Sequence, residues 1–142
     1  MIAGGFTRGR SSSSTPATLI EIYDPSTDLL AIGASMSTPR GFHTATLLPD
    51  GTVLASGGTG AVEIAKPAEV YDPRSDGWSP VGSMVFGTML HRAVLLDDGR
   101  ILTFGGSRDG QELSLPEVYE PSSRTWSVAY QLRFTKAPSP EE

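Results

Sequence analysis

The chain has 142 residues, of which 38% are hydrophobic, a composition typical of one globular domain. It contains no apolar run of the roughly 18 residues that a membrane-spanning helix needs. Its 16 acidic and 11 basic residues give a net charge of −5, which disfavours a nucleic-acid partner. The absence of cysteine excludes disulfides, thiolate metal sites and thiol nucleophiles. The 16 glycines and 11 prolines favour short strands joined by turns over long helices.

A pentapeptide recurs three times at a constant spacing. It reads EIYDP at residues 21–25, EVYDP at 69–73 and EVYEP at 117–121, so that each copy lies 48 residues after the previous one. The Asp-Gly pair at 50–51, the Gly-Gly pair at 57–58, His43, Met36 and Trp78 all recur at the same step. So many positions in one register indicate an internal repeat of a supersecondary unit.

One repeat unit predicts four short strands. Residues 43–48 and 52–56 are β-prone runs separated by the Asp-Gly pair at 50–51, whose residues tolerate the positive φ of a tight hairpin. Residues 68–71 predict a third strand, and a turn cluster separates it from a fourth strand that starts at Trp78. Because no apolar stripe with a 3.6-residue period is present, we expect four-stranded antiparallel meanders and almost no helix.

This pattern resembles the kelch family, and more narrowly the kelch-like repeats of bacterial proteins. The matching residues are 40–43 (RGFH), 47–54 (LLPDGTVL), 57–58 (GG), 69–73 (EVYDP) and Trp78. The likeness extends to about Leu132 and implies an all-β fold, namely a partial kelch-type β-propeller in which four-stranded blades pack around an axis. The family hosts many activities, so the resemblance alone implies little about function.

The repeat also predicts how the chain is divided. We expect an incomplete first blade at residues 1–33 that lacks its inner strand, full blades at 34–84 and 85–132, and a disordered tail at 133–142. Closed propellers have about four to eight blades, so each end of this array would leave an apolar sheet face uncovered. Two alternatives remain open. The favoured one is that the chain is a fragment of a larger propeller. The other is that its copies assemble: two copies would supply close to six blades, but the inner strand missing at each junction counts against this ring.

The chemically interesting residues mostly recur, which favours scaffolding roles. The glycine pairs lack the Lys-Ser/Thr sequel of a phosphate loop and are expected to end the inner strands. His43 and His91 could be metal ligands, but no third ligand recurs with them. We therefore expect them to make structural hydrogen bonds, with a secondary role beside Arg40 and Arg92 at the mouth of the central channel. The recurring glutamates and tyrosines are expected to be structural. The sequence predicts no catalytic residue, no metal and no cofactor.

Loops that differ between the units are the better functional candidates, because specificity tends to reside on loops held by a rigid scaffold. In a meander, the loops between the second and third strands emerge on the same face as the links between blades. The Asp-Gly turns lie on the opposite face. We expect a binding face at these loops and links, with the following contact residues: Arg8, Arg10, Arg40, Phe42, His43, Lys66, Phe86, His91, Arg108, Asp109, Gln111 and Glu112.

The favoured function is a non-catalytic binding or scaffold module that holds a protein, peptide or glycan on this loop face. Other blades of a longer chain, or further copies of this one, are the other expected partners; nucleic acid and membrane insertion are not expected. The resemblance also implies an alternative, a segment of a propeller enzyme similar to galactose-oxidase-like copper-radical oxidases or to sugar isomerases. The oxidase centre of that family uses a tyrosine cross-linked to cysteine, which this chain cannot supply. A purely structural surface array is a third possibility.

Overall fold

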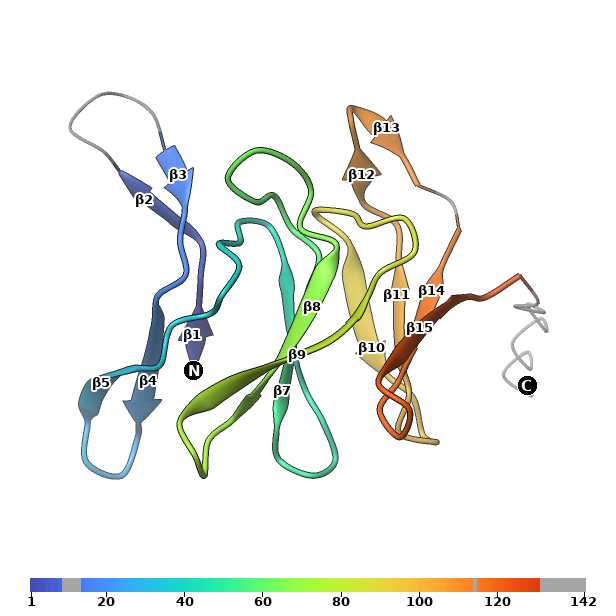
Figure 1. Ribbon diagram of the computed structural model, residues 1–142. Helices are drawn as coiled ribbons and strands as arrows, with labels where there is room; N and C mark the ends of the chain where they lie inside the picture. Colours follow the sequence, from blue (N-terminus) through green and yellow to red (C-terminus); the bar gives the residue numbers. More distant parts are fainter. Residues whose placement is uncertain (9–13, 114, 131–142) are drawn as a thin grey trace, which may run out of the picture.

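The computed structural model describes residues 1–8, 14–113 and 115–130, which form three antiparallel sheets side by side, joined in series (Figure 1). The first sheet consists of β1 (Ile2–Ala3), β4 (Ile20–Asp24) and β5 (Leu29–Gly33). The second consists of β6 (Thr44–Leu47), β7 (Val53–Ser56), β8 (Pro67–Asp72) and β9 (Gly77–Ser83). The third consists of β10 (Arg92–Leu95), β11 (Ile101–Phe104), β14 (Glu117–Glu120) and β15 (Thr125–Val128). These sheets are called blades 1, 2 and 3 below.

Two of the loops between the second and third strands of a blade form small hairpins of their own. They are β2 (Phe6–Arg8) with β3 (Ser14–Pro16) in blade 1, and β12 (Ser107–Arg108) with β13 (Gln111–Glu112) in blade 3. In blade 2 the corresponding loop is closed by a bridge between Thr59 and Ile64 and by hydrogen bonds from the Gly60 amide to the Glu63 carbonyl and from the Ala65 amide to the Gly58 carbonyl. No helix occurs in the part of the chain that the structure describes, so none there is long and apolar enough to cross a membrane.

Strand register reproduces the 48-residue repeat. Glu69 lies opposite Ala55 in blade 2, and Glu117 lies opposite Thr103, 48 positions later, in blade 3. Each Asp-Gly turn closes the inner hairpin in the same way, with Gly51 at φ 88° and Gly99 at φ 87°. The identical register confirms that the sequence repeat is one structural unit, the four-stranded meander.

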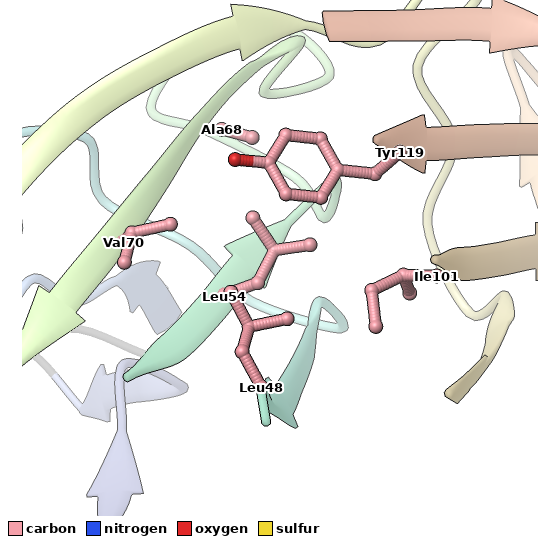
Figure 2. Packing of buried hydrophobic residues seen from close by; sticks show 6 residues of the cluster. All are labelled: Leu48, Leu54, Ala68, Val70, Ile101 and Tyr119. Carbon is pink, nitrogen blue, oxygen red and sulfur yellow. The ribbon is translucent and has the colours of Figure 1, made fainter. Parts of the chain in front are cut away.

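The core lies between the blades rather than within any one of them. Between blades 1 and 2, the buried residues are Ile20, Met36, Ala55 and Tyr71. Between blades 2 and 3 they are Leu48, Leu54, Ala68, Val70, Ile101 and Tyr119, with the Tyr119 ring directed at the sheet of blade 2 (Figure 2). Trp78 and Trp126 pack against the tyrosine of their own blade, with ring centroids 5.3 Å and 5.2 Å apart. A single sheet of this kind therefore depends on its neighbours for burial.

Two segments connect the blades, and we call residues 34–43 the first link and residues 84–91 the second link. Each runs from the last strand of one blade to the first strand of the next. The blade boundaries expected at residues 34 and 85 stay predictions. The tail expected at 133–142 lies outside the described residues.

Candidate binding face

The inter-strand loops of all three blades project from the same side of the array, opposite the tight turns (Figure 1). Both links run across this side and are fixed to the loops by backbone contacts. Gly41 bridges to Thr59, and Met89 bridges to Ser107. The two links are joined directly, because the Leu90 amide donates to the Phe42 carbonyl at 2.9 Å. The loop face is thus one continuous surface.

Three apolar side chains, Phe6, Phe42 and Leu90, form what we call the apolar strip of this face. The rings of Phe6 and Phe42 lie with centroids 4.7 Å apart at an angle of 57°. Their exposures are 40% and 51%, and Leu90 is 61% exposed. Gly41 makes the ring contact possible, since a Cβ at that position would lie 2.2 Å from Phe6 Cζ. The strip takes one residue from a loop of blade 1 and one from each link.

Phe42 and Leu90 hold their side chains on this face at a conformational cost. Their φ angles are 57° and 60°, in the left-handed region that is costly for large side chains. The two residues are 48 positions apart, so the same strained conformation occurs twice and exposes an apolar side chain both times. Strain of this kind clusters at binding and catalytic sites.

An open pocket of about 510 Å³ adjoins the Leu90 end of the strip. It is lined by Leu90, Gly105, Gly106, Ser107, Glu112 and Leu113. The polar neighbours of the pocket lie on the hairpin β12–β13, where Asp109, Gln111 and Glu112 are exposed. The strip and the pocket together offer an apolar surface with an acidic border.

Arg108 belongs to the same hairpin but is half-buried and already bonded. Its Nη1 donates to the Phe86 carbonyl at 2.6 Å, and its Nε lies 3.4 Å from the Asp109 carboxylate. Arg108 therefore fastens the hairpin to the second link. Phe86 is half-buried too, and its amide donates to Glu117. Lys66 is half-buried, and its carbonyl accepts a hydrogen bond from the Met84 amide.

Arg40 was expected on the exposed binding face, and that prediction is wrong. The side chain is fully buried and donates to Glu69 at 3.2 Å. It also donates to three backbone carbonyls of blade 2, those of Gly57, Ala65 and Pro67. Burial on its own would raise the pKa of Glu69, but the combined hydrogen bonds from Ser37, Thr38 and Arg40 lower it. The guanidinium is thus neutralised inside the molecule and unavailable to a partner.

His91 was also expected on that face, but it is only 5% exposed. Its Nε2 and the Thr44 hydroxyl share a hydrogen bond of 2.9 Å across the inner strand of blade 2. Burial, and then the charge of His43, lowers the pKa of His91 to about 4. Burial, and then the charge of Arg40, does the same to the pKa of half-buried His43. Both histidines are neutral at pH 7, and the structural role expected for His91 is the one observed.

The remaining predicted residues either lie on the surface or are wholly or partly outside the described structure. Arg92 is exposed at the start of β10. The backbone of Arg8 is described in β2, and Arg10 lies outside the described residues. Phe6 and Leu90 were not predicted from the sequence. Leu90 could have been found from the repeat, because it follows Phe42 by 48 positions. No cluster of three or more His, Asp or Glu side chains suited to a metal occurs among the described residues.

Comparisons with known proteins agree with this architecture. Residues 90–129 match the model of the kelch motif. A solved structure, described as the structure of YjhT, superposes with a TM-score of 0.70 at 16% identity, over 89% of this chain and 50% of that one. The chain thus spans half the length of that structure. No curated protein matches the sequence. The chain therefore has the fold of a partial β-propeller, and its residues 90–129 match the kelch motif.

Proposed function

We propose that this protein is a non-catalytic binding module whose loop face holds a peptide segment of a protein partner. One observation carries the proposal: the strip of Phe6, Phe42 and Leu90 is exposed, and its two link residues, Phe42 and Leu90, are held in a strained conformation. A strip of this kind is suited to binding, because exposed contiguous apolar surface on a folded protein usually marks an interaction site.

The surroundings of the strip indicate the chemistry of the ligand. Aromatic and aliphatic side chains of a peptide would rest on the two phenylalanine rings and on Leu90. Beyond Leu90, the side chains of Asp109 and Glu112 are exposed. Their carboxylates favour a basic residue next to the apolar anchors of the ligand. No observation in the described residues favours the propeller-enzyme alternative over binding.

The test is selection from a displayed random peptide library with the full chain as bait. We expect enrichment of peptides that combine apolar anchors with Lys or Arg. The enriched peptides should lose at least tenfold in affinity for a Phe42→Ser/Leu90→Ser double variant, because aromatic and aliphatic anchors dominate such interfaces. The matched control is Val62→Ser, a change at a loop position that is 97% exposed and outside the strip.

Two outcomes would contradict the proposal. One is enrichment of no peptide. The other is equal binding of the selected peptides to the double variant and to the control. A glycan array probed with the same three proteins forms a separate arm. Binding of glycans without peptides, lost in the double variant, would keep the strip as the site but replace the ligand class.

A further inference from the structure

Each junction between blades is assembled from the same three contacts. The first is a carboxylate that accepts consecutive amides of the link: Glu69 accepts Ser37 and Thr38, and Glu117 accepts Val85 and Phe86. The other two are the recurring tyrosine packed on the preceding blade and a glycine of that blade against which the link lies. A blade that packs against a neighbour on each side therefore makes these contacts on both of its faces.

The outer face of blade 1 exposes the residues that are buried at the interior junctions. Tyr23 is 49% exposed, whereas Tyr71 and Tyr119 at the equivalent positions are 2% and 1% exposed. Further apolar side chains on the outer strand add to this face, with Leu30 at 57% and Ile32 at 74% exposure. Among the described residues, no side chain or amide donates to the Glu21 carboxylate, the counterpart of Glu69 and Glu117.

The outer face of blade 3 is the complementary half of the same junction. Leu96, Leu102 and Val118 occupy the positions of Leu48, Leu54 and Val70, which receive Tyr119 at the interior junction (Figure 2). They line an open pocket of about 490 Å³. Among the described residues, nothing lies within 4 Å of a Cβ built at Gly105. At the equivalent Gly57, such a Cβ would lie 2.3 Å from the Thr88 carbonyl oxygen of the following link.

We propose that a second copy of this chain covers both faces, so that two copies close head to tail into one ring. A second copy is the occupant that the observations favour. The exposed face of blade 1 presents the recurring tyrosine, and the exposed face of blade 3 presents the apolar residues that receive this tyrosine at an interior junction. Two copies bring close to six blades, within the range of about four to eight found in closed propellers. The similar solved structure is also twice the length of the part that this chain matches.

The closed form has two identical junctions related by a two-fold axis. At each of them, Tyr23 of one copy packs against Leu102 of the other, as Tyr119 packs against Leu54 within one chain. The innermost strand, which adds Ala93 to the interior junction, is missing from blade 1, so each closing junction buries less surface than an interior one. The free edge that this absence leaves on β1 is only two residues long, and short edges are tolerated in β proteins.

The experiment measures the solution mass of the full chain by light scattering or sedimentation. We expect twice the chain mass of 15.0 kDa. Tyr23→Lys and Leu102→Glu should each reduce the mass to that of one chain, because each buries an unpaired charge at a junction. Val62→Glu, which introduces a charge on an exposed loop far from both faces, should leave the mass doubled.

Mixing the two monomeric variants in equal amounts gives the decisive arm. A mixed pair has one unaltered junction and one where the new lysine faces the new glutamate, so the doubled mass should return. Because the recovered complex requires two folded chains, misfolding of a variant cannot imitate this result. A monomeric unaltered chain at all concentrations would overturn the proposal. So would an unaltered dimer that neither substitution dissociates, or variants that fail to recombine.

Discussion

The two interior junctions have the same apolar design and different polar contacts. At the junction of blades 1 and 2, Arg40 and Glu69 form a fully buried ion pair. At the junction of blades 2 and 3, Thr88 stands in the place of Arg40, and Glu117 accepts two amides, at 2.6 Å and 3.0 Å. The carboxylate-to-amide contact is common to both junctions, and the buried cation is an addition to one of them.

The aromatic pairs show the same contrast. Tyr71 donates to Asp76 at 2.8 Å, and the indole of Trp78 donates to the Ala34 carbonyl at 2.8 Å. In blade 3, Arg124 stands where blade 2 has Asp76, and the buried Nε1 of Trp126 has no hydrogen-bond partner among the described residues. The difference indicates that apolar packing and the glutamate contact make a junction possible. The other hydrogen bonds then adjust the stability of each junction separately.

The largest difference between the junctions should appear on removing their carboxylates. Glu69→Ala leaves Arg40 buried without a counter-charge, and we expect a loss of about 3–5 kcal/mol in the free energy of unfolding. Glu117→Ala leaves two amides without an acceptor but no cation without a counter-charge, so we expect a loss of about 1–3 kcal/mol in the free energy of unfolding. Urea unfolding at one fixed protein concentration measures both.

Glu63→Ala is the control for these variants, since Glu63 is exposed in a loop and should change stability by less than about 0.5 kcal/mol. Equal losses for Glu69→Ala and Glu117→Ala would show that the ion pair adds nothing to the first junction. Adding Arg40→Met to Glu69→Ala should recover part of the loss, because it removes the unpaired charge.

A smaller effect should appear when the pH is lowered, because protonation of His43 and His91 should destabilise the two junctions. The pKa of each is lowered to about 4, whereas the unfolded chain protonates its histidines near pH 6.5. The unfolded state therefore binds more protons in that window, and the free energy of unfolding falls as the pH is lowered from 6.5. Between pH 6.5 and about pH 4.5 we expect a loss of about 2 kcal/mol from each histidine.

Urea unfolding across this pH range tests the assignment in single His43→Gln and His91→Gln variants. Each should flatten the pH dependence, because glutamine does not titrate. A dependence as steep in both variants as in the unaltered chain would assign the acid sensitivity to other groups.

The smallest effect separates the two buried tyrosines. Tyr71→Phe removes the hydrogen bond to Asp76 and should cost about 1 kcal/mol. Tyr119→Phe should cost no more than a few tenths of a kcal/mol, because no partner for its hydroxyl occurs among the described residues. Burial, followed by Asp76, raises the pKa of Tyr71 to about 12. Thermal unfolding gives the stabilities, and equal losses in the two variants would contradict this distinction.

Much of the fold could be predicted from the sequence because the signals are local and repeated. The 48-residue step, the Asp-Gly turns and the recurring tyrosines place the strands of each blade in their observed order. The candidate site was harder to predict. Arg40 lies in a link, and a charged residue in a connecting segment is normally exposed. Its burial depends on carbonyls of residues 57, 65 and 67, which no local pattern relates to residue 40.

The amino-acid sequence by itself determined the repeating meander, since strand length, turn type and the side chains of each face follow from residues close together in the chain. Only the tertiary structure decided which residues reach solvent. The links pass between blades, where Arg40 and His91 are enclosed by two sheets while Phe42 and Leu90 are turned outwards by their positive φ. Whether a residue is buried depends on its contacts with the neighbouring blade, and the residues that make these contacts lie far away in the sequence.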